Sequence, residues 1–329
     1  MVYAQVLAGL LLLLVGGDIF VRGAVGIARR LAISPLLIGL TLVGFGTSLP
    51  ELVASLEAAR VGSPGVAVGN VVGSNIANIL LILGLSALIA PIAVAPGSLR
   101  RDGPVLIATG LLTIGVCWFG RIDRWWGLLL LVLLLAYMAH AYLSERRHQD
   151  AQTRLHRAEA DEVKPLAVAP WPMLALTLSG LAGIVLGAGL LVDGAIALAR
   201  AFAVSETVIG LTIVAIGTSL PELATSVIAA LRRHGDVALG NVVGSNIFNL
   251  LGILGATALF RPIPVPAQIA QFDNWVMLAA TVLFIVFAAT KATLERWEGG
   301  VLLAAYAAYV ALLLAPSIVA GGGFALAPA

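Results

Sequence analysis

The stretch TLVGFGTSLPE at residues 41–51 occurs again, nearly unchanged, as TIVAIGTSLPE at residues 212–222. Each copy lies in a long apolar run and ends on a glutamate, Glu51 or Glu222, that follows a proline. A charged side chain at membrane depth costs about 2.5–3.5 kcal/mol on insertion scales, and a proline inside a helix removes a backbone hydrogen bond. Because this unfavourable feature occurs twice, it predicts a two-part site that handles cations.

Composition places the chain in a membrane. The chain has 329 residues, of which 60% are hydrophobic and 11% are charged, whereas soluble domains carry about 25% charged residues. Apolar runs long enough to cross a hydrocarbon core of about 30 Å follow one another along the chain. The first run has no basic flank and is longer than the core of a signal peptide, so we expect a retained helix. We predict an all-α membrane protein with ten transmembrane helices, at about residues 3–29, 34–60, 66–90, 104–119, 125–143, 171–199, 205–230, 237–260, 273–290 and 298–315.

The chain divides into two halves. A polar stretch at residues 144–165 separates residues 1–143 from residues 166–329, and the octet GNVVGSNI at residues 69–76 recurs at residues 240–247. Five helices in each half make the second half enter the membrane in the opposite sense, which predicts an inverted repeat with its site near the midplane. Basic residues concentrate in the loops on the side of residues 144–165, so we expect that loop to be cytoplasmic and both termini to face outward.

Polar side chains are spaced so that they gather around the two glutamates. Residues three and four positions apart share a helix face, and hydroxyl and amide residues recur at these spacings in both copies: Thr47, Ser48, Asn70, Ser74 and Asn78, with Thr218, Ser219, Asn241, Ser245 and Asn249. No Lys, Arg or His lies in the central part of these helices. A salt bridge within these helices is therefore disfavoured as the role of the glutamates, and cation binding or proton transport remains. Oxygen donors suit calcium and sodium, whereas zinc and copper prefer nitrogen and sulfur.

Other residues exclude other functions. The single Cys117 rules out an internal disulfide and a cysteine metal site, and no histidine is placed to activate Ser74 or Ser245 as a hydrolase nucleophile. We expect no cofactor, no nucleic-acid partner and no soluble protein partner, and we expect contacts with lipid and with the transported cations. Asp18 and Asp193 lack acidic counterparts in the other half and are interpreted as polar groups near helix ends. The glycines at 69, 73, 240 and 244 predict close helix packing.

At the two copies of both motifs, the chain resembles the cation/calcium antiporter superfamily, and within it the prokaryotic sodium/calcium exchangers. The resemblance implies that the second, third, seventh and eighth helices form the ion sites, while the first and sixth slide across them during transport. It implies calcium bridged by Glu51 and Glu222. The further ligands that it implies are carbonyls of Thr47 and Thr218, and sodium sites formed by Ser48, Ser74, Ser219 and Ser245 with the carbonyls of Gly44 and Ala215.

One position departs from part of that family. Some relatives carry aspartate where this chain has Asn249, and the matching position in the first half is Asn78. The predicted centre therefore has two formal negative charges. We expect a secondary active antiporter that exchanges calcium for sodium by alternating access, located in a prokaryotic plasma (inner) membrane. A proton/calcium or potassium-assisted antiporter on the same scaffold is the alternative, and a carboxylate-lined channel is a more distant one.

Overall fold

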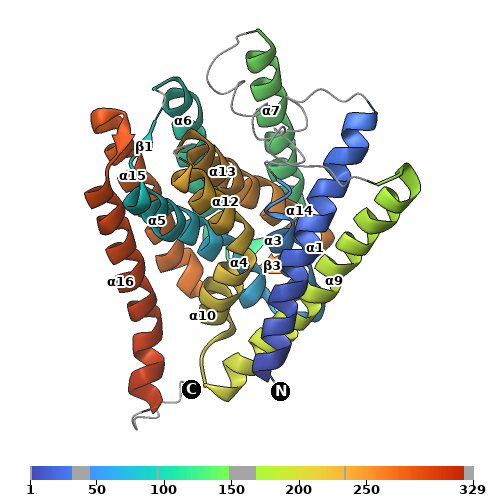
Figure 1. Cartoon of the computed structure of the whole chain (residues 1–329). Coiled ribbons are helices and arrows are strands. Elements are labelled where there is room, and N and C mark those ends of the chain that lie inside the picture. The colour runs from blue at the N-terminus through green and yellow to red at the C-terminus, as the bar shows by residue number, and fades with distance from the viewer. Residues whose placement is uncertain (1, 32–44, 95, 148–167, 233–234, 322–329) are drawn as a thin grey trace.

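The chain forms a bundle of helices (Figure 1). The computed structural model describes residues 2–31, 45–94, 96–147, 168–232 and 235–321. The first half contains α1 (Val2–Arg30), α3 (Leu49–Val61), α4 (Pro64–Ala77), η2 (Asn78–Leu83), α5 (Gly84–Ile89), β1 (Ile92–Ala93), α6 (Pro96–Trp118), β2 (Arg121–Ile122) and α7 (Arg124–Arg147). The second contains α9 (Pro170–Ala201), α10 (Glu206–Ile209), η3 (Gly210–Val214), α11 (Ala215–Thr218), α12 (Leu220–Leu231), α13 (Gly235–Phe248), η4 (Asn249–Ile253), α14 (Leu254–Phe260), β3 (Ile263–Pro264), η5 (Ile269–Asp273), α15 (Asn274–Lys291), β4 (Thr293–Leu294) and α16 (Arg296–Gly321).

The architecture is that of an all-α membrane protein. Seven helical spans among the described residues are long and apolar enough to cross a membrane, or eight if the bent pair at residues 206–231 counts as one span. Helix also occurs in the described part of each of the ten predicted ranges, although residues 45–48 form a turn and α6 begins at Pro96, before the predicted start at 104. Residues 34–44 of the predicted second helix, and most of the predicted polar linker at 144–165, lie outside the described residues.

The two copies of the glutamate motif share one local backbone conformation, and the second copy interrupts a helix. Ser48 and Ser219 share almost the same non-helical backbone, with φ −88° and ψ 9° in the first and φ −83° and ψ 10° in the second. A new helix starts directly after each, with Pro50 or Pro221 in its first turn, where a proline is tolerated. In the second copy the axis bends by 50°. The predicted local unwinding at the glycines and prolines is confirmed, and it places each glutamate at the start of a helix.

Two elements form one flank of the bundle. α1 and α9 run side by side along most of their length, and α9 also packs on α3 (Figure 1). A Cβ added at Gly9 would lie 2.7 Å from the backbone nitrogen of Leu191, so the two helices approach closely only because glycine has no side chain. On the opposite flank, α16 packs on α5 and η2.

The glycine faces of α4 and α13 differ. A Cβ at Gly73 would lie 2.6 Å from the carbonyl oxygen of Leu211 in η3, and one at Gly69 would lie 2.9 Å from that of Thr207. These glycines permit close packing, as predicted. A Cβ at Gly244 would meet no atom of the described residues within 4 Å, so the predicted close packing is not observed at this position among them. The glycine faces of α4 and α13 therefore differ within the part of the chain that the structure describes.

Short strands connect the two halves. β1 pairs with β4 through Ile92 and Leu294, and β2 pairs with β3 through Arg121 and Pro264. Both pairs are antiparallel, and each joins a strand of the first half to one of the second. These pairs satisfy backbone groups in loops that leave the helices, and they fix the ends of α5, α6, α14 and α15 relative to one another.

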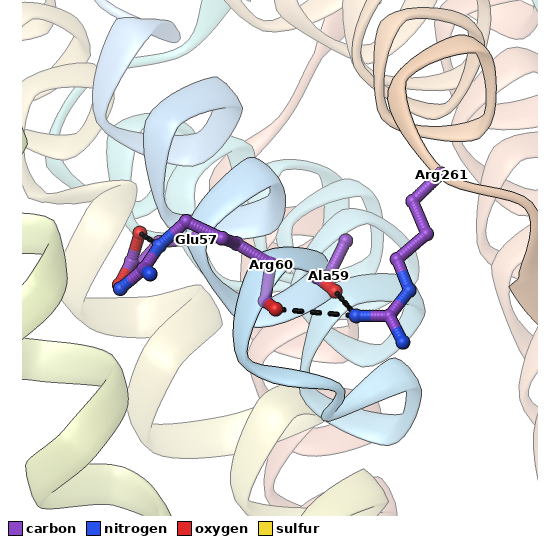
Figure 2. Close-up of polar contacts among 4 residues, drawn as sticks. All are labelled: Glu57, Ala59, Arg60 and Arg261. Carbon is purple, nitrogen blue, oxygen red and sulfur yellow. Dashed lines mark hydrogen bonds and ion pairs between the residues drawn. The ribbon is translucent and has the colours of Figure 1, made fainter.

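A side chain of the second half caps a helix of the first (Figure 2). α3 ends at Gly62, whose φ of +80° is left-handed. The last carbonyls of a helix lack intrahelical partners, and Arg261, just after α14, donates Nη1–H to the carbonyls of Ala59 at 3.0 Å and Arg60 at 3.1 Å. The Arg60 side chain turns instead to Glu57, at 2.6 Å. Arg261 thus links the ends of α3 and α14.

Candidate cation site

The two glutamates meet at the interface between the halves. Glu51 lies in the first turn of α3 and Glu222 in the first turn of α12, and both are 0% exposed. The Ser219 hydroxyl donates to Oε1 of Glu51 at 2.8 Å, and the Ser48 hydroxyl donates to Oε1 of Glu222 at 2.8 Å. Each glutamate is therefore held by the serine of the other copy. These reciprocal hydrogen bonds bring the two copies of the motif face to face.

The second oxygen of each carboxyl group has no partner. Oε2 of Glu51 and Oε2 of Glu222 are both buried and accept no hydrogen bond from the described residues, and the two carboxyl groups are close enough to repel each other. A buried charge is costly unless it is paired or coordinates a metal. Two buried oxygens without donors, on groups that repel, form an environment that a cation would stabilise.

Asn70 supports Glu51 from behind. Its amide nitrogen donates to the carbonyl of Glu51 at 3.0 Å and to the hydroxyl of Ser55 at 2.9 Å, and its amide oxygen accepts from the hydroxyl of Thr218 at 3.0 Å. All the amide atoms of Asn70 are thus engaged with protein groups. We interpret Asn70 as a clamp that positions the start of α3.

Asn241 repeats this clamp more loosely. Its amide nitrogen lies 3.4 Å from the carbonyl of Glu222 and 3.2 Å from the hydroxyl of Ser226, and its amide oxygen lies 3.5 Å from the hydroxyl of Thr47. Each of these distances exceeds its counterpart around Asn70. The clamp of the second half is therefore the looser one, on the same element as the unpacked Gly244.

Asn78 and Asn249 each begin a π-helical segment and differ in their bonding. Asn78 donates from Nδ2 to Oδ1 of Asn246 at 2.9 Å, which leaves its own Oδ1 unpartnered. Both Oδ1 and Nδ2 of Asn249 are buried without a partner. Two amide oxygens are therefore free at the positions that the sequence predicts as ligands.

The remaining predicted ligands lie around these groups. Ser245 donates to Oε1 of Glu222 at 3.4 Å, and Ser74 donates to the carbonyl of Ala215 at 3.4 Å. That carbonyl also accepts from the backbone N–H of Ser219 at 3.1 Å, so it is already engaged. Among the described backbone hydrogen bonds outside regular helices, none reaches the carbonyl of Thr47 or Thr218. Gly44 lies outside the described residues.

Some polar residues at the site were not expected from the sequence. Ser55 and Ser226 each accept from a clamp asparagine, and Asn75 and Asn246 join α4 to α13, with Asn246 donating to the carbonyl of Asn75 at 3.3 Å. Both pairs stand 171 positions apart, as the glutamates do. The repeat itself was therefore the signal that could have identified them.

The donor set consists of oxygen atoms from several residue types. In the part of the chain that the structure describes, no group of three or more His, Cys, Asp and Glu residues lies together. Carboxylate, amide, hydroxyl and carbonyl oxygens suit hard cations such as calcium. They do not form the nitrogen and sulfur sets that zinc or copper prefer.

A helical membrane protein with paired buried carboxyl groups and this donor set has the features of a cation transporter. The chain belongs to the sodium/calcium exchanger protein family, whose model it matches over residues 1–143 and 173–315. The sodium/calcium exchanger MaX1 of Methanosarcina acetivorans is 35% identical, over 93% of this chain and 97% of the relative. Inner membrane protein YrbG of Escherichia coli is 39% identical, over 91% and 92%.

A solved structure supports the same assignment. The sodium-calcium exchanger NCX_Mj, soaked with sodium and strontium ions, superimposes with a TM-score of 0.62 at 34% identity, over 94% of this chain and 99% of that one. At this identity and coverage the likeness extends beyond fold to family. The protein is thus an integral membrane protein and a cation exchanger.

Proposed function

We propose that this protein exchanges calcium for sodium across the membrane, with Glu51 and Glu222 as the carboxyl groups that both ions share. The observation that carries the proposal is the reciprocal bonding of these glutamates, each of which keeps one buried oxygen without a partner. Calcium neutralises both carboxylates at once, and sodium ions neutralise them together. An empty or half-filled site keeps an uncompensated charge, which hinders its movement between the two faces of the membrane.

The proposed ligands are oxygen atoms, and calcium takes six to eight of them. The carboxylates supply two unpartnered oxygens, and the amides of Asn78 and Asn249 supply two more. Carbonyls and hydroxyls complete the set in this proposal, from Thr47, Thr218, Ser48, Ser219, Ser74, Ser245, Gly44 and Ala215.

We propose that the ten helical ranges form two inverted repeats of five. Equivalent features support this: a helix begins directly after Ser48 and after Ser219, 171 positions apart, and π-helical segments begin at Asn78 and Asn249, also 171 apart. The strand pairing also supports the repeat. In the second half, β3 is the counterpart of β1, and β4 is the counterpart of β2. β1 pairs with β4 and β2 pairs with β3, so each strand pairs with the counterpart of the other one. Such reciprocal pairing is expected of two repeats related by a two-fold axis in the membrane plane.

The differences between the two clamps support alternating access. Contacts around Asn70 are short and Gly73 is packed, whereas contacts around Asn241 are longer and Gly244 faces open space. We propose that the two halves exchange these conformations as the site opens to the other face. In the proposed orientation, with residues 144–165 cytoplasmic and both termini outside, the open side is the cytoplasmic one. α1 and α9, which pack together, are the elements proposed to slide.

The name of MaX1 states sodium/calcium exchange of that relative, and this supports sodium as the coupling ion here. The test is calcium uptake into vesicles that contain the purified protein, driven by an outward sodium gradient or by a proton gradient without sodium. We expect uptake with the sodium gradient. Uptake with the proton gradient alone would indicate that protons, and not sodium, are the coupling ion. Uptake that needs no counter-ion would indicate a channel.

The same assay tests the two carboxylates. Glu51→Gln and Glu222→Gln keep the shape of the side chain and remove its charge, so each is expected to abolish sodium-driven calcium uptake in a folded protein. Glu57→Gln is the matched control, because Glu57 lies on α3 but pairs with Arg60, away from the site. Wild-type uptake by either site variant would contradict the proposal.

A further inference from the structure

A buried carboxyl group lies outside the cation site, where η5 meets α15. Asp273 is 0% exposed, and its Oδ1 accepts a hydrogen bond from the hydroxyl of Tyr309 in α16 at 2.9 Å. Its Oδ2 is buried and has no hydrogen-bond partner among the described residues. The adjacent Asn274 is also 0% exposed, and neither of its amide atoms has a hydrogen-bond partner. The proposed exchange mechanism uses none of these groups.

The first half contains the same pairing of an aspartate with a tyrosine, and there an arginine lies beside the aspartate. Asp102 stands 171 positions before Asp273, and the hydroxyl of Tyr137 donates to its Oδ1 at 3.3 Å. Asp102 is also buried, at 5% exposure, but Nε of Arg101 lies 2.7 Å from its Oδ1. The position equivalent to Arg101 in the second half is Phe272. An aspartate–tyrosine pair is therefore built twice, and an arginine neutralises only the first.

No cation compensates Asp273 in the part of the chain that the structure describes. From α16 the phenols of Tyr309 and Tyr306 face this region, and from α6 the thiol of Cys117 lies beside Asn274. Gln268, in the preceding turn, is its other polar neighbour. α4 and η2 also pack against η5 or α15 and contain no titratable residue. An isolated charged carboxylate in such surroundings becomes neutral rather than remain ionised.

A proton fits this site better than a metal ion. Calcium needs six to eight oxygen ligands, and among the described residues Asp273 belongs to no cluster of three His, Cys, Asp and Glu side chains. One unpartnered carboxyl oxygen, by contrast, is sufficient for a proton. The hydroxyl of Tyr309 already occupies Oδ1, so Oδ2 is the atom that remains for it.

We propose that Asp273 is a proton-binding site separate from the two glutamates, with the proton on Oδ2 at neutral pH. Loss of this proton leaves an uncompensated charge between α15 and α16. α16 packs on η2, which begins at the candidate ligand Asn78. A charge left in this buried position is unfavourable to the folded protein, so the stabilising effect of the proton is lost as pH rises. Stability and exchange are expected to fall together on the alkaline side.

The first experiment detects the proton itself and does not depend on transport. Infrared difference spectra between neutral and alkaline pH are recorded for protein carrying Glu51→Gln and Glu222→Gln, so that neither site glutamate contributes. We expect the C=O band of a protonated carboxyl group at neutral pH and its loss at alkaline pH. Adding Asp273→Asn should remove the band, whereas adding the matched control Asp102→Asn should leave it. A band unchanged by Asp273→Asn would overturn the proposal.

Two further measurements test the proposal even if Asp273→Asn folds poorly in the background that lacks both glutamates. Tyr309→Phe removes the donor that favours the charged form, so the band should persist to higher pH, and an unchanged titration would contradict the proposal. In otherwise wild-type protein, the melting temperature should fall from neutral to alkaline pH, and Asp273→Asn should reduce this fall. An equal fall in both proteins would also count against a proton on Asp273.

Discussion

At the scale of single residues, function depends on which polar atoms are left without partners. Glu51 and Glu222 each use one oxygen for a serine of the other half and keep one free. Asn70 has the same chemistry as Asn249, but its amide is fully engaged by the protein, whereas that of Asn249 has no partner. Residue type alone thus does not separate a clamp from a candidate ligand, because both are buried asparagines of the repeated motif.

The two π-segment asparagines give a prediction at this scale. Asn249→Asp places a third carboxylate among the unpartnered oxygens without breaking a hydrogen bond, so calcium should bind more tightly. Asn78→Asp removes the donor to Oδ1 of Asn246 and sets two oxygens against each other. It should therefore cost about 1–3 kcal/mol of stability. Titration calorimetry with calcium measures the binding affinity, and thermal unfolding measures the stability. Weaker calcium binding by Asn249→Asp would show that the site does not use that position.

At the scale of elements, glycine contacts and helix ends determine how the halves fit. α4 reaches η3 only because Gly73 has no side chain, and α13 has no such contact at Gly244. The ends of α3 and α14 are joined through Arg261 (Figure 2). Each of these contacts crosses from one half of the chain to the other, so each bears on how the halves move.

Alanine at the two equivalent glycines should have different effects. At Gly73 the new Cβ would lie 2.6 Å from the carbonyl of Leu211, so α4 and η3 must separate, at a cost of about 1–3 kcal/mol. At Gly244 the new Cβ meets no atom of the described residues, so thermal stability should stay as in the wild type or rise slightly, because alanine favours a helix more than glycine does. If the halves exchange conformations, however, Gly244→Ala should slow calcium exchange. Equal losses of stability in the two variants would contradict the asymmetry.

Two arginines near the end of α3 form another matched pair. Arg261→Ala removes the side-chain donor to the carbonyls of Ala59 and Arg60, although Ala59 still accepts from the backbone N–H of Gly62, and should lower stability by about 1 kcal/mol. Arg60→Ala removes an exposed side chain whose ion pair with Glu57 should contribute little. Thermal unfolding in detergent compares the two. A larger loss for Arg60→Ala would show that the link between α3 and α14 is not what stabilises this region.

At the scale of the whole molecule, the asymmetry between the halves determines from which face the site is reached. Gly244 faces open space on the proposed cytoplasmic side, while Phe119, at the end of α6, is 70% exposed on the proposed outer side. Cys117 is the single cysteine of the chain, so a Cys117→Ala background removes the only native thiol. Accessibility of introduced cysteines therefore reports orientation and conformation together.

The prediction is that Gly244→Cys in this background reacts with a membrane-impermeant thiol reagent added from the cytoplasmic side. Phe119→Cys should react only from the outside and serves as the control for sidedness. Labelling is followed by mass shift in right-side-out and inside-out vesicles. Labelling of both cysteines from the opposite sides would indicate that the topology is the reverse of the proposed one. Labelling of Gly244→Cys from the outside alone would instead contradict the open cytoplasmic side.

The sequence by itself determined the all-α membrane character, the family and the pair of costly glutamates, because apolar length, motif repetition and the burial of charge are readable along the chain. The helix breaks were equally predictable, since proline and glycine act locally. Some helix boundaries agree closely, as with the predicted 66–90 and the observed span from α4 to α5, Pro64–Ile89. The start of α6 does not, because the helix begins at Pro96 and continues through Pro104, where the sequence predicted its start.

Only the tertiary structure decided the contacts between segments far apart in the chain. It paired each glutamate with the opposite serine, distinguished the engaged Asn70 from the unpartnered Asn249, and packed Gly73 while leaving Gly244 open. It also showed that Asp273, unlike Asp102, has no arginine beside it in the described chain. The physical reason is the same throughout. Identical residues in two copies of a motif acquire different roles when the helices around them pack differently.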